Sequence, residues 1–223
     1  MMTTETKEQK KKMIIEHLTW DDSVNADDIK VTIEDGTAEL WGSVQNYTAK
    51  MAAERDAYQV EGVRKVKNHL DIQFPPTMSL PGDGEIEAHL EKLINWNREL
   101  HAGHIHVECD QNVVTLSGTA ESFWEKHVIL NLANATNGVI EVNDQLRVKP
   151  PRVLNDEIIA NDIREAFRRN YLIDEHQINV EVHHGSVHLR GTVPGFLVKI
   201  EANTIATYTS GVTDVVDDMT IAQ

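Results

Sequence analysis

Cysteine and long hydrophobic runs are nearly absent from this sequence of 223 residues. Its one cysteine, Cys109, excludes an internal disulfide framework and fits either a reducing compartment or a buried, inert thiol. No stretch approaches the roughly 20 consecutive apolar residues that a membrane-spanning helix needs. The first twenty residues contain no apolar run longer than Met13-Ile14-Ile15, so no secretory signal is recognised there. The sequence therefore predicts a soluble, cytoplasmic protein without a transmembrane segment.

Basic residues are also scarce, with 21 lysines and arginines against 36 acidic residues and a formal net charge of −15. Residues 1–75, 76–150 and 151–223 carry 10, 5 and 6 basic residues against 14, 11 and 11 acidic ones. Such an acidic surface repels nucleic acid phosphates and discourages unspecific adhesion to anionic lipid. The compact basic cluster Lys10-Lys11-Lys12 is typical of a solvated first helical turn. We therefore expect no nucleic acid partner.

The motifs of common catalytic sites are missing as well. The sequence has no glycine-rich phosphate loop, no His-Glu-x-x-His zinc motif and no nucleophile elbow. Its carboxylates are scattered over positions whose patterns indicate exposure to solvent. Cys109 falls on the buried face of a predicted hairpin, where a thiol is unreactive. We therefore expect that the protein is not an enzyme and needs no cofactor.

One segment of the sequence is present three times. Residues 29–72 align without a gap after a shift of 76 positions, and again after a further shift of 73. The aligned positions are Val31, Val107 and Val180; Leu40, Leu116 and Leu189; Gly42, Gly118 and Gly191; Gly62, Gly138 and Gly211; Leu70, Leu146 and Met219; Ile72, Val148 and Ile221. A fixed period defines the structural unit. We predict three domains, 1–75, 76–150 and 151–223, with boundaries at Pro75-Pro76 and Pro150-Pro151.

Every unit shows the same order of patterns: helix, strand, strand, helix, strand. The first helix has an apolar stripe at helical spacing, and in the third unit Asn155 precedes it as a cap. The second helix has small or apolar residues on one side, and a glycine is expected to end it at Gly62, Gly138 or Gly211. The apolar stripe of the first helix consists, in the three units in turn, of Ile14, Ile15 and Leu18; Ile86, Leu90, Leu93 and Ile94; and Ile158, Ile159, Ile163, Ala166 and Phe167.

The two strands between the helices form a predicted hairpin with a two-residue turn. The turn residues are Asp35-Gly36, Gln111-Asn112 and His184-Gly185, which suit a backbone with positive φ. This turn fixes the cross-strand pairs as Val31 with Leu40, Ile33 with Ala38, Val107 with Leu116, Cys109 with Val114, Val180 with Leu189 and Val182 with Val187. One hairpin face is therefore apolar. We expect Gly42, Gly118 and Gly191 to allow close approach of a helix.

These segments resemble the BON domain family, named for bacterial OsmY and nodulation proteins. The resemblance rests on "IKVTIEDGTAELWGSV" with "VEGVRKVKNHLDI", and on two further copies of the same pattern. It covers almost the whole chain, and Asn112 departs from the glycine usual at the turn. The resemblance implies an α+β fold of three tandem αββαβ domains, each with two helices on one face of a three-stranded mixed sheet.

The resemblance also implies a function without catalysis. Relatives of this kind associate with phospholipid or other envelope surfaces, often in osmotic or envelope stress, and some bind ligands or ions. Lipid head groups or envelope components are therefore the first expected partners. An alternative is a cytoplasmic adaptor for another protein, or a small-ligand or ion-binding protein that uses the interfaces between repeats. The acidic charge favours this alternative, and the resemblance favours surface association.

Histidines supply the sharpest candidate site. His104 and His106 are predicted to point the same way from the sheet face opposite the helices, where two ring nitrogens could share a metal ion. The other interpretation is that exposed histidines simply fill a polar face. A second group, His183, His184 and His188, is weaker, because His184 lies in the turn and His188 opposes Glu181 as an ordinary polar pair.

Tryptophans are the candidate contact residues. The strand alternation places Trp41 on the face away from the helices, where it could anchor a membrane or partner or pack against a neighbouring repeat. Trp124 follows the second hairpin and is a further possible surface or partner contact, or a residue packed at the start of a helix. Trp20 and Trp96 align at the end of the first helix and are interpreted as core or helix-edge residues.

Overall fold

The computed structural model describes residues 6–74 and 79–222, so the predicted boundary at Pro75-Pro76 lies outside the described residues. Residues 80–220 form one compact unit that holds the second and third repeats, and the first repeat belongs to a separate unit. Within the second unit, Pro150-Pro151 lies in an irregular connector between the last strand of one repeat and the first helix of the next.

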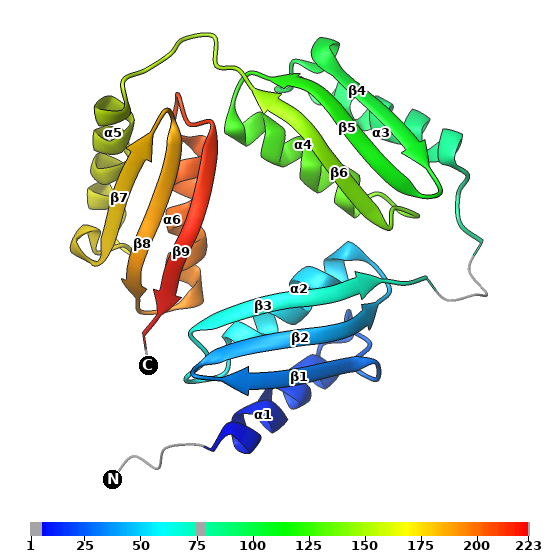
Figure 1. Ribbon diagram of the computed structural model, residues 1–223, viewed down its shortest axis with the longest axis vertical. Helices are drawn as coiled ribbons and strands as arrows, with labels where there is room; N and C mark the ends of the chain where they lie inside the picture. The colour runs from blue at the N-terminus through cyan, green and yellow to red at the C-terminus, as the bar shows by residue number, and fades with distance from the viewer. Residues whose placement is uncertain (1–5, 75–78, 223) are drawn as a thin grey trace. The chain divides into compact units, whose positions relative to one another are not determined.

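All three repeats have the predicted order of elements (Figure 1). The first contains α1 (Lys7–Trp20), β1 (Ile29–Glu34), β2 (Thr37–Val44), α2 (Tyr47–Tyr58) and β3 (Lys65–Ile72). The second contains α3 (Asp83–Trp96), the short 3-10 helix η1 (Ala102–His104), β4 (Ile105–Asp110), β5 (Val113–Ala120), α4 (Phe123–Ala135) and β6 (Glu141–Val148). The third contains α5 (Asp156–Arg169), η2 (Glu175–Gln177), β7 (Ile178–His183), β8 (Ser186–Val193), α6 (Phe196–Tyr208) and β9 (Asp214–Ile221).

Each repeat forms a mixed sheet of three strands in sequence order. β1 pairs antiparallel with β2, and β2 pairs parallel with β3. The second sheet repeats this arrangement with β4, β5 and β6. In the third, β7 and β8 are antiparallel, and side-chain contacts from Ser186 to Asp214 and from Thr192 to Thr220 run in step along parallel β8 and β9. The predicted α+β class is therefore confirmed.

The hairpin register agrees with the sequence pattern in every predicted pair. Asp35, Gln111, Asn112 and His184 have positive φ between 46° and 64°, and Gly36 and Gly185 have φ of 75° and 81°. These angles are those of a two-residue turn whose twist matches the flanking strands. A short local signal was therefore sufficient to fix which side chains face the helices.

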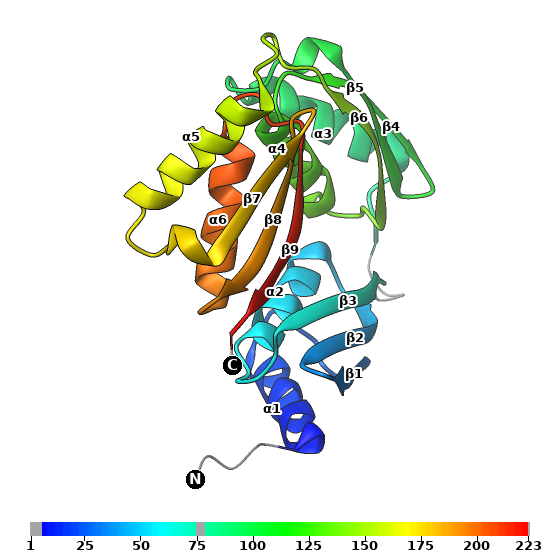
Figure 2. The same ribbon diagram turned by 60° about the vertical axis from the view of Figure 1, so that its left-hand side comes forward.

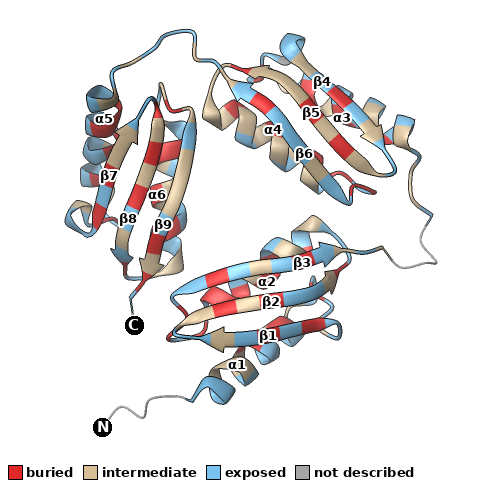
Figure 3. Ribbon diagram, in the orientation of Figure 1, coloured by how far each residue is buried: buried red, intermediate tan, exposed pale blue. Residues whose placement is uncertain are grey.

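The helices of each repeat cover one face of its sheet and bury the core there. Figure 3 shows buried positions alternating along the strands, and the turned view in Figure 2 shows α5 and α6 on one side of the third sheet. In the second repeat the buried cluster is formed by Ile86, Leu90, Ile94, Leu100, Val107, Val114, Leu116, Ile129, Ala133, Val139 and Leu146. The opposite sheet face has no helix from its own repeat, and we call it the helix-free face.

Side-chain caps explain where the helices begin. Thr6 and Gln9 form a reciprocal capping box at α1, so this helix starts at Lys7, seven residues before the first apolar residue of the predicted stripe, Ile14. Asn155 caps α5 as predicted, because its side chain accepts a hydrogen bond from the Glu157 N–H.

Of the helices within residues 6–74 and 79–222, none is both long and apolar enough to cross a bilayer.

The expected role of Gly42, Gly118 and Gly191 is wrong. These glycines have φ between 118° and 145°, and a Cβ built on each would lie 1.9 Å from a backbone carbonyl oxygen. That oxygen belongs to Asp28, His104 or Gln177, in the segment that enters the first strand, and not to a helix. The glycine is therefore required because two backbones nearly touch where the hairpin begins.

The expected helix stop at Gly62, Gly138 and Gly211 also needs correction. The second helices end at Tyr58, Ala135 and Tyr208, and each glycine follows three or four residues later with φ between 81° and 94°. A Cβ on Gly138 would meet Pro81 and Ile86, and one on Gly211 would meet Leu154 and Ile159. These glycines lie in a turn under the first helix of their repeat, so close helix approach is their role.

Candidate functional site

The helix-free face of the first repeat carries a row of three side chains across the sheet. The register places Lys30 beside Trp41 and Trp41 beside His69, one from each strand. The indole of Trp41 stacks on the imidazole of His69, with ring centroids 4.0 Å apart and planes inclined by 17°. Trp41 nevertheless remains 45% exposed. The row therefore places a partly exposed pair of stacked aromatic rings next to a cation.

Lys65 and Lys67 lie on the same face as this row, which itself contains Lys30. Lys67 forms an ion pair with Glu39 on the neighbouring strand at 2.7 Å, and this hydrogen bond lowers the pKa of the Glu39 carboxyl. Lys30 and Lys65 are exposed and form no ion pair with any described residue. The ammonium groups of Lys30 and Lys65 are therefore available to an anionic surface. Each would contribute about 1 kcal/mol to the binding of such a surface.

The other two repeats lack this arrangement at the same positions. In the second sheet the corresponding row is His106, Ser117 and Gln145. In the third it is Asn179, Arg190 and Asp218, and Arg190 is held by Glu181 at 3.2 Å and by Asp218 at 3.7 Å. The aromatic and cationic row is therefore a property of the first repeat among these three faces.

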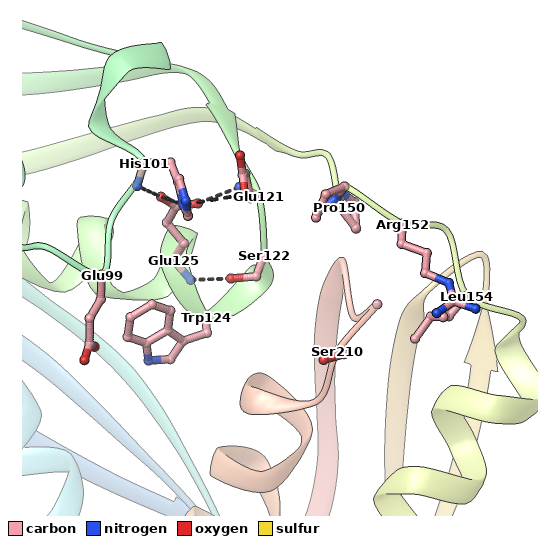
Figure 4. Close-up of a pocket in the computed structure, with 12 residues that line it drawn as sticks. Glu99, His101, Glu121, Ser122, Trp124, Glu125, Pro150, Arg152, Leu154 and Ser210 are labelled. Atoms are coloured by element: carbon pink, nitrogen blue, oxygen red, sulfur yellow. Dashed lines mark hydrogen bonds and ion pairs between the residues drawn. The ribbon is translucent and has the colours of Figure 1, made fainter.

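A groove of about 460 Å³ lies between the second and third repeats (Figure 4). Its walls include Glu99, His101, Glu121 and Trp124 on one side and Arg152 on the other. α4 and α6 pack against each other beside it, and the Trp124 and Tyr208 rings lie 5.7 Å apart. The indole N–H of Trp124 is buried and has no hydrogen-bond partner among the described residues. The groove combines an aromatic ring with carboxylates.

Glu125, which also lines this groove, is engaged within its own domain. Its side chain is 2% exposed and accepts hydrogen bonds from the backbone N–H groups of His101 and Glu121. The His101 imidazole lies 3.5 Å from Glu121 and 3.7 Å from Glu125. The aligned residues in the other repeats are Ala49 and Val198, so this buried carboxylate is particular to the second repeat. Glu125 ties the segment before β4 to the start of α4.

The predicted metal pair does not gain further ligands in the structure. His104 ends η1 just before the strand, so it is not part of β4 as the pattern indicated, and His106 is the second residue of β4. Both side chains are exposed. Within residues 6–74 and 79–222 no group of three or more His, Cys, Asp or Glu side chains could hold a metal ion. Metal binding by His104 and His106 stays a prediction. His184 lies in the turn and His188 opposes Glu181, as expected.

The tryptophans have different surroundings. Trp20 and Trp96 are the last residues of α1 and α3 and are 78% and 71% exposed, so they are helix-edge and not core residues. Trp124 is half-buried at the start of α4 and contacts the third repeat through Tyr208. Trp41 packs on His69 of its own repeat.

Cys109 lies half-buried on the inner side of β4, opposite Val114 as predicted. Burial and a hydrogen bond from the thiol to Asp83 raise the pKa of Cys109 to about 11. Only the thiolate reacts with alkylating reagents, so reaction at pH 8 should be at least about tenfold slower than for the same cysteine in the urea-unfolded chain. The rate should keep rising with pH up to about 11, which stopped-flow or mass-spectrometric alkylation would measure. Equal rates in the folded and unfolded chain would contradict the buried environment.

Two functional candidates were missed by the sequence patterns, Lys50 on α2 and Asn68 on β3. The repeat alignment contains the signal, because Lys50 aligns with Lys126 and Lys199, whereas Asn68 aligns with Asp144 and Asp217. Only the fold shows that the helix lysine contacts this third-strand residue, as Lys126 contacts Asp144 and Lys199 contacts Asp217.

The fold defines a modular protein made of three tandem αββαβ domains. The BON domain model matches residues 6–73, 82–150 and 155–223, and the chain belongs to the BON domain family. It is similar to osmotically-inducible protein Y of Escherichia coli strain K12, with 27% identity over 143 residues that cover 61% of this chain and 71% of that protein.

Solved structures give only distant similarity. The C-terminal domain of CdsD, a structural protein of the type III secretion system of Chlamydia trachomatis, is 13% identical with a TM-score of 0.27, covering 94% of this chain and 95% of that one. The periplasmic domain of the inner membrane protein PrgH from S. typhimurium is 12% identical with a TM-score of 0.21, covering 88% and 95%. These low scores carry no argument about the present chain.

Proposed function

We propose that this protein is a non-enzymatic binding protein of the osmotic or envelope-stress type, which associates with phospholipid or envelope surfaces through its tandem BON domains. Membership of the family and similarity to osmotically-inducible protein Y support the stress-related, non-catalytic part of this proposal. The observation that carries the surface association is the Lys30, Trp41 and His69 row on the helix-free face of the first repeat.

This row has the chemistry of a membrane-interface contact. An indole prefers the head-group region, because its ring is apolar and its N–H is polar. Lysines beside it are attracted to anionic head groups over a distance limited by salt screening. The protein as a whole is acidic, so contact through this one face would orient the remaining surface away from the lipid.

Co-sedimentation with vesicles of phosphatidylglycerol and phosphatidylethanolamine tests this proposal. We expect the full chain to sediment at low salt, and Lys30→Asn to weaken binding about fivefold, since one lysine near an anionic surface contributes about 1 kcal/mol. Trp41→Ser should weaken it as well, and the residues introduced already occupy these positions in other repeats, at Asn179 and Ser117. Trp96→Ser is the control, because Trp96 is an exposed tryptophan outside the row. Absence of binding at low salt, or equal loss in the control, would contradict the proposal.

The groove between the second and third repeats supports a second candidate function, the binding of a small ligand or ion at an interface between repeats. Trp124 presents an aromatic ring near Glu99 and Glu121, a combination that suits a small organic cation. Titration with tetramethylammonium chloride, followed by amide NMR shifts of residues 121–125, would detect such binding. Trp124→Ala should abolish shifts that Trp96→Ala leaves intact. No shift at millimolar cation would remove this candidate.

A further inference from the structure

A lysine on the second helix is present in all three repeats, but its partner differs in the first. In the second repeat the Lys126 ammonium lies 2.7 Å from the Asp144 carboxylate and donates to the backbone oxygen of Leu146 at 3.0 Å. In the third repeat Lys199 lies 2.7 Å from Asp217 and donates to the backbone oxygen of Met219 at 2.7 Å. The third strand therefore neutralises the helix cation in both repeats.

Asn68 replaces this aspartate in the first repeat. Its side-chain oxygen still accepts a hydrogen bond from the Leu70 N–H at 3.2 Å, as Asp144 and Asp217 do from Leu146 and Met219. Its amide group, however, donates to the backbone oxygen of Lys50 at 2.8 Å and more weakly to Glu54 at 3.4 Å. Asn68 therefore keeps the hydrogen bond to the backbone N–H two residues later, but it lacks the negative charge that the aspartates place beside the lysine.

The Lys50 ammonium consequently has no hydrogen bond or ion pair with any residue in 6–74 or 79–222. Lys50 is half-buried and lines a pocket of about 690 Å³ together with Trp41, Ser43 and His69. The pocket therefore joins a cation that lacks its counterion to the aromatic stack of the helix-free face.

We propose that this pocket binds a phosphate group, with the Lys50 ammonium in the place of the missing intramolecular ion pair. An ammonium and a phosphate oxygen form a strong, charge-assisted hydrogen bond, and a hydroxyl such as that of Ser43 can donate another. The inference rests on and deepens the proposed surface association, because it names the chemical group that the face of the first repeat recognises.

The other charges of the pocket restrict the ligand. Asp28 and Asp71 also line it, and their carboxylates disfavour a multiply charged anion. A phosphodiester carries one negative charge, and an ammonium group near it would be attracted to these carboxylates. The pocket is therefore better suited to a phosphoethanolamine head group, in which both charges are present, than to inorganic phosphate.

The test compares soluble and membrane-bound sources of this group. The full chain is titrated with glycerophosphoethanolamine and with inorganic phosphate, and binding is followed by amide NMR shifts of residues 42–43 and 70–71. In parallel, sedimentation with vesicles of phosphatidylethanolamine or of phosphatidylcholine measures whether the chain binds the same group when it belongs to a lipid. Asn68→Asp supplies internally the carboxylate that the other repeats have, and Lys50→Met removes the cation. Asn143→Asp, on the exposed face of the second sheet, is the control of equal charge.

We expect glycerophosphoethanolamine to bind more tightly than inorganic phosphate. Asn68→Asp and Lys50→Met should each weaken its binding about tenfold or more, the loss expected for a charge-assisted hydrogen bond, while Asn143→Asp should bind like the original chain. Asn68→Asp should remain folded because aspartate occupies this position twice already. Unchanged affinity in both variants, tighter binding of inorganic phosphate, or the absence of any shift would overturn the inference.

The failure of this inference differs from that of the proposed function. If vesicles bind but the soluble phosphodiester does not affect the pocket amides, surface association stands and the phosphate site is wrong. If the soluble ligand binds but vesicles do not, the site stands and association with membranes is wrong.

Discussion

Gly42→Ala should destabilise the first domain by about 3 kcal/mol or more, which is most of the stability expected of a domain this small. The new Cβ would lie 1.9 Å from the carbonyl oxygen of Asp28 and 3.0 Å from its carbonyl carbon. The φ of 120° is also strained for any residue with a side chain. Neither contact can be relieved by rotating a side chain, because the opposing atoms belong to the backbone. Hydrogen exchange of first-domain amides, read by mass spectrometry, would measure the loss.

Gly84→Ala provides the control for this prediction. Gly84 lies in the first turn of α3, and an added Cβ would meet no atom within 4 Å. Alanine is the better helix former, so the change should be neutral or stabilising by up to about 1 kcal/mol. If Gly42→Ala exchanged no faster than Gly84→Ala, the close approach of the Gly42 and Asp28 backbones would be incorrect.

Lys199→Met should destabilise the third domain by about 2 to 3 kcal/mol, because it leaves the partly buried Asp217 carboxylate without its cation. Lys199 is 8% exposed and donates to both Asp217 and Met219. Asn203 would remain as a neutral donor to Asp217, which limits the loss. Hydrogen exchange of third-domain amides would measure the effect.

Two variants make this prediction selective. Lys50→Met removes the aligned lysine, which has no ion pair in the described part of the chain, so it should cost no more than about 0.5 kcal/mol. The double variant Lys199→Met with Asp217→Asn reproduces the asparagine of the first repeat and should recover part of the loss. Equal destabilisation by Lys50→Met and Lys199→Met would show that the two lysines do not differ as the structure indicates.

The hairpins were predictable because their signals are local. Two residues suited to positive φ, placed between alternating strands, fixed every cross-strand pair, including Cys109 with Val114. The apolar stripes located the helices, although α1 extends to Lys7 because Thr6 and Gln9 cap it. The pattern identifies the glycine positions but not their roles, because the sequence does not show whether a backbone or a helix lies opposite each glycine.

The candidate sites were less predictable, because they depend on residues far apart in the chain. The pattern placed Trp41 on the correct face, but its stack on His69 required the parallel pairing of β2 with β3. Trp124 was selected from its position after a hairpin, and its contact with Tyr208 arises from the packing of α4 on α6. Glu125 looked like one of many scattered carboxylates until its two backbone donors were brought together.

By itself, the sequence determined a chain of three homologous αββαβ units, the register of each hairpin and the side of each sheet that faces helices. These properties follow from short-range turn geometry and from the periods of two and about 3.6 residues. Tertiary structure decided which lysine lacks a counterion, which glycines oppose a carbonyl group and which aromatic rings meet. Those contacts join residues that are between 14 positions apart, as Gly42 and Asp28 are, and 84 positions apart, as Trp124 and Tyr208 are. A contact of this kind exists only when folding brings its two groups within reach.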